Sequence, residues 1–424
     1  MKKHIAKLLV LVFALTSIFS FSPNQAYAKE TDQAHYPIVM VHGLFGWGNN
    51  EMRDIYYWGG SDSLREWLCD KGYTVYTPTI GPISSNWDRA CELYAYLKGG
   101  TVDYGKAHAE KYGHARYGRT YPGIYEEFGE ATASGDIRKI NLVGHSMGGQ
   151  TIRTLVQLLE KGSAAEKRVT PSDELSPLFT GGKSWVHSVT TIATPHDGSQ
   201  VAHKKYQMEP LINQFYAAWA AKNGAAVDPS EANIDFQLDQ WGLKRNKGES
   251  YASYYKRVMK SNLWKKTKDL SVWDLSPEGA GDLNTWVHAQ SDVYYFSIGC
   301  LDTHESPITG YQVPNSNMSN ALRRSSIFMG RYTNDRFGEV PIDRSWWKND
   351  GIVSVISSSS PKVYSKDTET DYNGHPEKGV WNYIETIDNV DHFEIVQMKQ
   401  NRTELLNKYL KLVKMLDGLP KDTE

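Results

Sequence analysis

Short runs of apolar residues, each closed by a turn, recur along the chain from residue 37 onward. Such runs are typical of buried strands in a parallel sheet. We expect strands at residues 37–41, 73–79, 140–143, 186–193 and 293–298. After the third run, Ile152, Leu155, Val156 and Leu159 share one face of an expected helix. Strands that alternate with helical stretches predict a mostly parallel central sheet flanked by helices.

Two segments interrupt this alternation. Residues 81–122 are polar, aromatic and glycine-rich, with little helical or strand periodicity. We interpret them as an inserted subdomain. Residues 198–247 carry apolar residues at helical spacing, which predicts a helical cap, or lid. These apolar residues are Leu211, Phe215, Tyr216 and Trp219. Because the chain has no internal repeat and no linker-like tract, we expect one domain over residues 29–424.

The first residues have the pattern of an export signal. A basic start precedes an almost unbroken apolar run over residues 8–21, and Ala26-Tyr27-Ala28 then supplies the small residues that signal peptidase needs. The run is too short to span a bilayer comfortably. We therefore expect a signal peptide over residues 1–28, an extracellular mature protein, and no stable insertion into a membrane.

The composition narrows the possible partners. The 47 Lys and Arg residues nearly balance the 49 Asp and Glu residues, for a net charge of -2, so a nucleic-acid partner is not indicated. The 13 Trp and 26 Tyr residues fit a large core together with an apolar binding surface. The cysteines, Cys69, Cys91 and Cys300, cannot all pair, and a disulfide framework is not expected.

The segment Gly144-His145-Ser146-Met147-Gly148 has the pattern G-x-S-x-G between an expected strand and an expected helix. In the α/β-hydrolase fold this pattern holds a nucleophilic serine on a strained turn, and the flanking glycines leave room for the backbone. His42-Gly43-Leu44 ends the first strand, where the same fold supplies a second oxyanion donor. We therefore expect Ser146 as the nucleophile and the backbone N–H groups of Leu44 and Met147 as the oxyanion hole.

A nucleophilic serine needs a histidine base, and in this fold the base follows the serine late in the chain. His392 lies in a loop-like segment before the final helical stretch, which favours it. His304 and His375 lie in polar loops and compete with it. His196 directly follows an expected strand and is expected to cap the turn there.

The base needs a carboxylate that orients it. Asp350 precedes Gly351 and an apolar pair, so it lies at the junction of two elements. Asp302 and Asp391 compete for the role, although Asp391 adjoins His392 and would point elsewhere. The residues alone leave the choice of acid open.

Longer segments resemble a known family, the bacterial true lipases of the thermoalkalophilic bacillus type and their staphylococcal relatives. The matching segments are residues 82–90, 99–105, 118–123, 190–198, 238–243, 349–353 and 390–392. Gly144 and Met147 follow the staphylococcal members, whereas thermoalkalophilic members usually have Ala at the first position of the motif. The resemblance implies Ser146, Asp350 and His392 as the catalytic triad.

The resemblance also implies a structural zinc site. Its ligand positions are occupied by Asp88, His108, His114 and Asp239. Two imidazoles and two carboxylates can close a tetrahedral shell that leaves no position for substrate. The six-residue separation of the two histidines does not suit one helix face, so we expect them on a loop. Zinc would hold the inserted segment against the cap region.

A calcium site in this family takes oxygen ligands near the catalytic histidine. Glu394 matches one ligand position, and Asn317 matches a backbone-carbonyl position. The second acidic position is Lys399, whose ammonium group cannot coordinate a metal, whereas calcium needs at least six oxygens. Either the site is lost, with the Lys399 ammonium group in place of the ion, or other oxygens were recruited to it. We expect a weakened or absent calcium site.

The resemblance implies a secreted triacylglycerol lipase that hydrolyses esters at an oil–water interface through an acyl-enzyme. The cap would cover an acyl-binding cleft and open at lipid surfaces. A carboxylesterase or a phospholipase on the same fold is the nearest alternative. A secreted lipid-binding protein without activity is a further alternative, which the complete set of triad and oxyanion positions disfavours.

Overall fold

The computed structural model describes residues 35–421, except residue 53, residues 207–234, and residues 262 and 267. The expected signal peptide lies outside the described residues. So do the apolar residues on which the expected lid rests, namely Leu211, Phe215, Tyr216 and Trp219.

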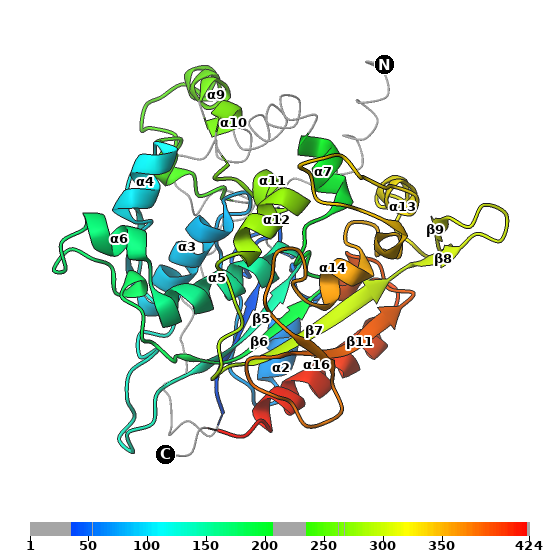
Figure 1. The fold of residues 1–424 in the computed structure, drawn as a ribbon. Coiled ribbons are helices and arrows are strands. Elements are labelled where there is room, and N and C mark those ends of the chain that lie inside the picture. The colour runs from blue at the N-terminus through cyan, green and yellow to red at the C-terminus, as the bar shows by residue number, and fades with distance from the viewer. Residues whose placement is uncertain (1–34, 53, 207–234, 262, 267, 422–424) are drawn as a thin grey trace. The chain divides into compact units, whose positions relative to one another are not determined.

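A seven-stranded sheet is the centre of the described fold (Figure 1). Its strand order is β10-β11-β7-β6-β5-β1-β2, and each neighbouring pair is parallel. The strands are β1 (Ile38–Val41), β2 (Val75–Tyr76), β5 (Ile140–His145), β6 (Val186–Ile192), β7 (Tyr294–Leu301), β10 (Glu369–Asp371) and β11 (Trp381–Asp388). The expected mostly parallel sheet with flanking helices is confirmed. The edge strand β10 and its neighbour β11 were not predicted from the sequence.

Helices and two short hairpins surround the sheet. The helices are α2 (Leu64–Cys69), α3 (Asn86–Lys98), α4 (Lys106–Tyr112), α5 (Met147–Lys161), α6 (Ala164–Val169), α7 (Gln200–Tyr206), α9 (Tyr251–Lys260), α10 (Leu263–Lys266), α11 (Ser271–Asp274), α12 (Pro277–Asn284), α13 (Arg323–Met329), α14 (Val355–Ser359), α15 (Glu394–Gln397) and α16 (Arg402–Asp417). Single turns of 3₁₀ helix are η2 (Pro177–Phe179), η4 (Asp239–Trp241) and η5 (Arg344–Trp346). The hairpins are β3 (Gly100–Asp103) with β4 (Tyr117–Tyr121), and β8 (Thr303–Glu305) with β9 (Gln312–Pro314).

The sheet has a hydrophobic core on each face. Because successive side chains of a strand point to opposite faces, β1 supplies both cores. Val39 and Val41 lie in the core that includes apolar residues of α3 and α5, whereas Ile38 and Met40 lie in the core that includes those of α2 and α16. A strand buried on both faces is apolar throughout, which is why these runs predicted parallel strands.

The inserted segment, residues 81–122, is more regular than its sequence indicated. It contains α3, α4 and the β3–β4 hairpin. The sequence of α3 shows little periodicity because this helix buries polar as well as apolar residues, including Asp88, Arg89 and Glu92. A helix with buried charges on its inner side shows no clean apolar stripe in its sequence.

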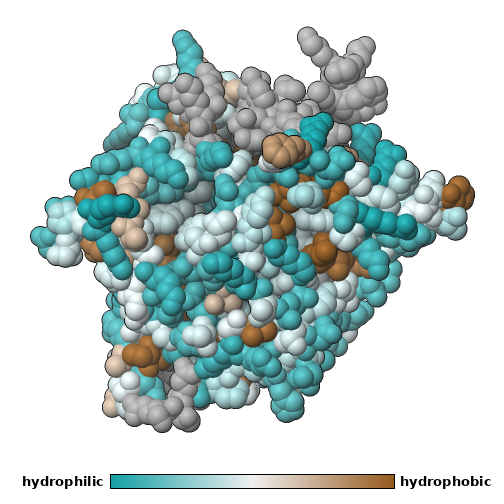
Figure 2. Space-filling model, in the orientation of Figure 1, coloured by the Kyte–Doolittle hydropathy of each residue, from teal (hydrophilic) through white to brown (hydrophobic). Residues whose placement is uncertain are grey.

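The visible surface is mostly hydrophilic, and its hydrophobic residues form small separate patches (Figure 2). One of them is the tip of the β8–β9 hairpin, where Ile308 is 92% exposed. None of the described helices combines the length and the apolar character needed to cross a bilayer.

Candidate active site

Ser146 occupies the sharp turn between β5 and α5. Its backbone has φ 56° and ψ -130°, a left-handed conformation that a non-glycine residue adopts only under strain. The glycines two residues before and after Ser146 are required because a larger side chain would clash with the backbone there. A Cβ atom at Gly144 would lie 2.5 Å from the backbone nitrogen of Gly149, and one at Gly148 would lie 2.2 Å from the carbonyl oxygen of Val41. The motif therefore forms the expected turn, with the serine at the N-terminus of a helix.

Three side chains from distant parts of the chain form one hydrogen-bonded row. Nε2 of His392 lies 2.9 Å from Oγ of Ser146, and Nδ1 of the same ring lies 2.8 Å from Oδ2 of Asp350. The other oxygen of Asp350 accepts hydrogen bonds from the backbone N–H groups of Ile352 and Val353, at 3.0 and 2.7 Å. All three side chains are largely buried. A serine, an imidazole and a fixed carboxylate in this order can activate a nucleophile.

The fold brings this row to the carboxyl edge of the sheet. Ser146 directly follows β5, and His392 lies in the loop after β11. The loop that carries Asp350 is tied to the end of β7, because the N–H group of Asp302 donates to the carbonyl of Asn349 at 3.1 Å. Open α/β sheets present their functional loops at this edge.

Asp302 and Asp391, the other candidates for the carboxylate that orients His392, have other hydrogen-bond partners. Asp302 accepts a hydrogen bond from the side-chain amide of Asn315 at 3.0 Å. The carboxylate of Asp391 accepts from the backbone N–H groups of Phe393 and Glu394. Asp391 therefore holds the turn that follows His392 and does not orient its ring.

The other histidines considered from the sequence do not contact Ser146. His304 is exposed on β8, and its Nδ1 lies 2.7 Å from the side-chain oxygen of Asn315. His375 is exposed in the loop between β10 and β11. His196 is buried, and its Nε2 lies 3.0 Å from Oγ1 of Thr191. Burial and the charge of Arg153 lower the pKa of His196 well below its ordinary value, so this ring is a neutral core group.

Met147 directly follows Ser146, and Leu44 follows Gly43, where an added Cβ atom would lie 2.7 Å from Cβ of Ser146. Met147 is the first residue of α5, so its N–H has no partner within the helix. On either side of Leu44, Gly43 N–H donates to the Tyr57 hydroxyl and Phe45 N–H donates to the Pro82 carbonyl. Among the described residues, no hydrogen bond involves the N–H of Leu44 itself. The N–H groups of both expected oxyanion donors therefore have no hydrogen-bond partner among the described residues.

Tyr57 supports this region and was not predicted from the sequence. Its hydroxyl accepts the N–H of Gly43 at 2.9 Å and lies 2.6 Å from Nδ1 of His145, the residue before Ser146. Burial, followed by the charge of His392, lowers the pKa of His145 well below its ordinary value, whereas burial raises that of Tyr57. The tyrosine is therefore protonated and donates to the neutral imidazole. No short motif marks such a residue, because only the fold brings it near Gly43.

Arg89 is a second support that the sequence did not reveal. This buried side chain of α3 donates to the carbonyl of His42 at 2.5 Å and to that of Gly81 at 2.6 Å. It also donates to the hydroxyl of Thr151 in α5 at 2.9 Å. Burial lowers its pKa only to about 10, so the guanidinium remains charged and ties the backbone before Leu44 to two helices.

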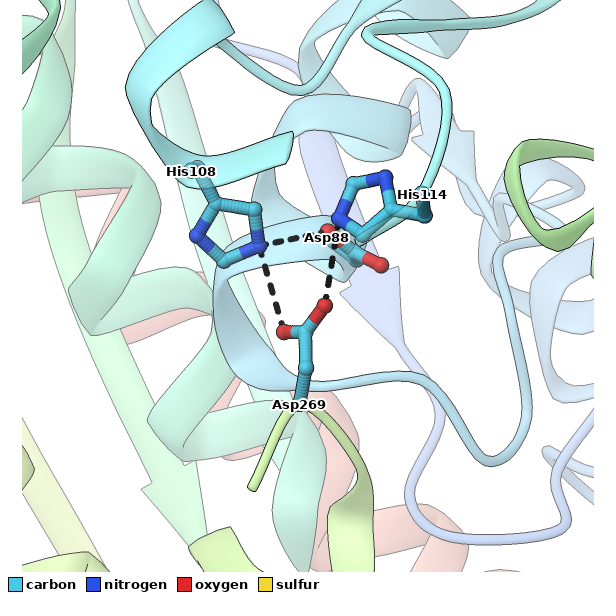
Figure 3. Close-up of side chains that lie close together, drawn as sticks. All are labelled: Asp88, His108, His114 and Asp269. Atoms are coloured by element: carbon cyan, nitrogen blue, oxygen red, sulfur yellow. Dashed lines mark ion pairs between the residues drawn. The ribbon is translucent and has the colours of Figure 1, made fainter. Parts of the chain in front are cut away.

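A buried group of two histidines and two aspartates lies beside α3 (Figure 3). Nε2 of His108 lies 3.2 Å from Oδ1 of Asp88 and 3.2 Å from Oδ1 of Asp269. Nε2 of His114 lies 3.3 Å from Oδ2 of Asp269. For metal–ligand bonds of 2.0–2.1 Å, a tetrahedral zinc site has ligand atoms about 3.3 Å apart. The contacts of the two histidines with the aspartates therefore have the spacing expected between ligands of a tetrahedral zinc ion.

The potential metal-ligand atoms of this group face one another and make few hydrogen bonds to other residues. Oδ1 of Asp88 and Nε2 of both histidines are buried and make no hydrogen bond with the described residues. Nδ1 of His114 lies 2.8 Å from the carbonyl of Ala115, which fixes its proton there and leaves Nε2 as a free lone pair. The ring of His108 stacks on Trp87 with the centroids 5.0 Å apart. These orientations suit metal ligands.

Charge also favours a cation at this site. With neutral imidazoles the group carries a charge of -2, which a divalent ion would cancel. Burial lowers the pKa of His108, but the carboxylates of Asp269 and Asp88 outweigh it and raise that pKa to about 9. Burial and the neighbouring Asp269 carboxylate raise the pKa of Asp88. In the absence of a metal, the group therefore retains protons to offset its buried negative charge.

The structure corrects two predictions about this group. Asp239 does not lie in it, because its carboxylate accepts a hydrogen bond from the guanidinium of Arg119 at 2.6 Å. The fourth acid is Asp269, which precedes α11. The expectation of a loop is confirmed for His114 but was wrong for His108. His108 belongs to α4, and His114 follows the left-handed Gly113 that ends this helix. The turn there lets residues six apart converge.

The expected calcium ligands are held by hydrogen bonds. The carboxylate of Glu394 accepts the backbone N–H groups of Lys399, Gln400 and Asn401 at 3.0, 2.7 and 2.7 Å. The side-chain amide of Gln400 donates to the carbonyl of Asn317 at 3.1 Å. Among the described residues, the ion pairs do not include one between Lys399 and Glu394. The expected ammonium contact is therefore wrong, and it is the backbone of this turn that reaches the carboxylate.

The chain matches the family described as "Lipase-like, C-terminal domain" over residues 34–422. It is 39% identical to Lipase 1 of Staphylococcus aureus strain MRSA252 over 373 residues, which are 87% of this chain and 51% of the relative. It is 38% identical to a lipase of Staphylococcus epidermidis over 395 residues, 91% of this chain and 53% of the relative. The chain thus spans about half the length of the curated relatives it matches.

Solved structures resemble the fold closely. EstA from Clostridium botulinum has a TM-score of 0.81 and 46% identity, over 92% of this chain and 88% of that one. Lipase 1 from Pelosinus fermentans has a TM-score of 0.78 and 48% identity, over 91% and 100% of the two chains. Staphylococcus hyicus lipase has a TM-score of 0.79 and 34% identity, over 92% and 98%. The resemblance to staphylococcal lipases is confirmed, and the chain belongs to the lipase-like C-terminal domain family.

Proposed function

We propose that the protein is a serine carboxylic-ester hydrolase, and more specifically a triacylglycerol lipase, with Ser146 as its nucleophile. The observation that carries the proposal is the hydrogen-bonded row of Ser146, His392 and Asp350 beside two open backbone N–H groups. The names of the relatives, which are lipases, support the same reaction class.

The geometry suits a two-step mechanism. Nε2 of His392 takes the proton of Oγ while Oγ attacks the ester carbonyl carbon, and the N–H groups of Leu44 and Met147 stabilise the resulting oxyanion. His392 then gives the proton to the departing alcohol oxygen, which leaves an acyl group on Ser146. A water molecule, activated by the same ring, releases the carboxylic acid.

Apolar residues beside the oxyanion donors support a fatty-acyl substrate. Met147 lies in a buried cluster with Ala202 of α7 and Leu275, and Leu44 packs against it. Leu44 and Phe45 also pack against a larger apolar cluster that includes Phe236 and Leu238. Apolar surroundings favour an acyl chain over a charged one. The expected lid over residues 198–247 remains part of the proposal.

Zinc at Asp88, His108, His114 and Asp269 is a further part of the proposal. Two nitrogen and two oxygen donors with the observed spacing suit zinc, which such a complete shell would bind as a structural ion. The site would tie α3 and α4 to the segment before α11, and so fix the inserted segment. Hydrolysis needs no step at this site.

Secretion completes the proposal. The basic start, the apolar run and Ala26-Tyr27-Ala28 have the pattern of a cleaved signal peptide. Cys69, Cys91 and Cys300 are unpaired in the fold, so stability outside the cell would not rest on disulfides. N-terminal sequencing of the exported protein tests the expected cleavage after Ala28.

One assay tests the substrate class. Hydrolysis rates are measured on emulsified long-chain triacylglycerols and on soluble short-chain esters, with the Ser146→Ala variant as the control for background. A lipase gives a rate on emulsions that rises steeply above the solubility limit of the substrate. Activity confined to soluble esters would instead show a carboxylesterase, and the absence of either activity would exclude the proposal.

A further inference from the structure

A second group of potential metal ligands lies apart from the first. It comprises His203 of α7, Glu278 of α12 and Glu339, which precedes Val340 in a loop. Nε2 of His203 lies 3.1 Å from a carboxylate oxygen of Glu339 and 3.6 Å from one of Glu278. His203 is buried, and the glutamates are partly buried. Three segments far apart in sequence thus converge on one imidazole nitrogen.

The ring of His203 is held in a fixed orientation. Its Nδ1 lies 3.0 Å from the hydroxyl of Tyr332. With the proton on Nδ1 shared with this hydroxyl, the lone pair of Nε2 faces the two carboxylates. In this tautomer the lone pair and the two carboxylates repel one another, and a cation among them relieves the repulsion. In the other tautomer Nε2 donates to Glu339 at 3.1 Å. A partner on the far nitrogen of this kind is typical of metal-binding histidines.

One carboxylate oxygen at the site has no other role. Oε1 of Glu278 accepts the backbone N–H of Val340 at 3.1 Å. Oε2 of Glu278 is buried and makes no hydrogen bond with the described residues. A proton on His203 would account for the contact with Glu339, but it would leave this oxygen unsatisfied. A metal ion can take it as a ligand.

We propose that His203, Glu278 and Glu339 bind a second zinc ion, with water in the fourth position. One nitrogen and two carboxylate oxygens are a donor set that zinc accepts, whereas calcium and magnesium prefer oxygen alone. Nε2 of His203 lies 3.1 Å from Oε2 of Glu339 and 3.6 Å from Oε1 of Glu278, close to the spacing of about 3.3 Å between ligand atoms in a tetrahedral site. An ion there would take Oε2 of Glu278 as a ligand by binding both oxygens of that carboxylate.

The site has a structural consequence for the proposed active site. The residue before His203 is Ala202, which packs with Met147 and Leu275, and Leu44 contacts the same cluster. A metal that ties α7 to α12 and to the loop at Glu339 would fix Ala202 against both proposed oxyanion residues. Zinc at this site would therefore stabilise the wall of the catalytic region. The proposal stands on metal binding alone, so it is tested independently of hydrolysis.

The test counts the zinc bound by the whole protein. Metal-free protein is dialysed against a low excess of Zn²⁺, and bound zinc is measured by elemental analysis. We expect two ions in the wild type and one in Glu339→Gln. The matched control, Glu305→Gln, removes an exposed carboxylate that pairs with Arg344 on the surface, and it should retain two. Asp269→Asn should lose the other ion and keep this one.

A second variant distinguishes the loss of a metal site from misfolding, which could also lower the zinc content of Glu339→Gln. Tyr332→Phe keeps every ligand, and we expect it to weaken zinc binding at this site by about 10-fold through loss of the partner of Nδ1. Calorimetric titration with Zn²⁺ measures this change, and a parallel titration with Ca²⁺ should show no binding at the site. The proposal would be overturned if the zinc content of Glu339→Gln equalled that of the wild type, or if Asp269→Asn bound no zinc at all.

Discussion

Nδ1 of His392 lies 2.8 Å from Oδ2 of Asp350, and the backbone N–H of His392 also donates to the carbonyl of Asp350 at 3.0 Å. The two residues are therefore joined twice, by side chain and by backbone. The backbone bond fixes the distance between the loops, so the side-chain bond can set the orientation and the tautomer of the ring.

Asp350→Asn tests this relationship. The amide would keep the shape of the carboxylate, but it would favour the wrong tautomer of His392 and would not stabilise the imidazolium. We expect kcat on a soluble ester to fall by about 10⁴-fold with little change in the circular dichroism spectrum. Asp302→Asn is the control, since Asp302 is bound to Asn315 and does not touch the ring. An equal loss in the control would contradict the assignment.

The nucleophile and the base are tested by a second set of variants. Ser146→Ala should lower turnover by a factor on the order of 10⁴ or more, because it removes the atom that attacks the substrate. His392→Ala should behave alike, whereas His304→Ala and His375→Ala should retain most of the activity. Initial rates with active-site titration measure all four. If Ser146→Ala retained a tenth of the wild-type rate, the nucleophile would lie elsewhere.

Much of this site could be predicted from the sequence. The G-x-S-x-G motif is local, so its turn, its strand and its helix are encoded within a few residues of Ser146. His392 followed from the chain order of the fold, although residues alone could not separate Asp350 from Asp302. That choice depends on loops that meet only in three dimensions. The expected strands were found because a strand buried on both faces has to be apolar throughout.

The fourth aspartate of the metal-ligand group shows where the sequence was insufficient. Asp239 lies in the correct region, since the neighbouring Gln240 donates to Asp88 at 2.8 Å, yet its own carboxylate pairs with Arg119. Asp269 lies 30 residues further along the chain and reaches the same site. Helix α3 was missed for a related reason, because its inner side carries buried charges that only partners from other segments can satisfy.

Tyr57→Phe tests the support of the oxyanion region. The change leaves the N–H of Gly43 buried without its acceptor, and leaving such a group unsatisfied costs about 1–3 kcal/mol. We expect the free energy of unfolding to fall by that amount in urea denaturation, with a loss of kcat because Gly43 adjoins Leu44. Tyr311→Phe is the control, as this tyrosine is 41% exposed on the surface. A stability equal to that of the wild type would show that water replaces the hydroxyl.

Variants of Asp269 and Asp239 test which of the two aspartates is the fourth zinc ligand. Asp269→Asn should release one zinc ion and lower the melting temperature, because three ligands hold zinc less tightly than four. Asp239→Asn should keep that ion, since Asp239 pairs with Arg119 outside the group. Elemental analysis and thermal melts of both variants check the prediction. Loss of zinc from Asp239→Asn but not from Asp269→Asn would restore the assignment made from the sequence.

The turn after α15 yields the prediction for calcium. The carboxylate of Glu394 accepts three backbone N–H groups, and Gln400 joins this carboxylate to the carbonyl of Asn317. Donors thus occupy the oxygens that would have to face a calcium ion. The three N–H donors compensate the charge of this carboxylate, so the turn does not need a metal ion to hold it.

We therefore expect the activity and the melting temperature to be the same in millimolar calcium and in a calcium-selective chelator. Lys399→Asp restores the missing acidic position. It places a second negative charge near Glu394, which calcium would relieve, so the melting temperature of this variant should rise when calcium is added. Lys399→Ala is the control, because it removes the ammonium group without adding a ligand. Its melting temperature should be as insensitive to calcium as that of the wild type. A wild-type melting temperature that rose by several degrees in calcium would show that the turn opens to bind the ion, despite the hydrogen bonds that close it.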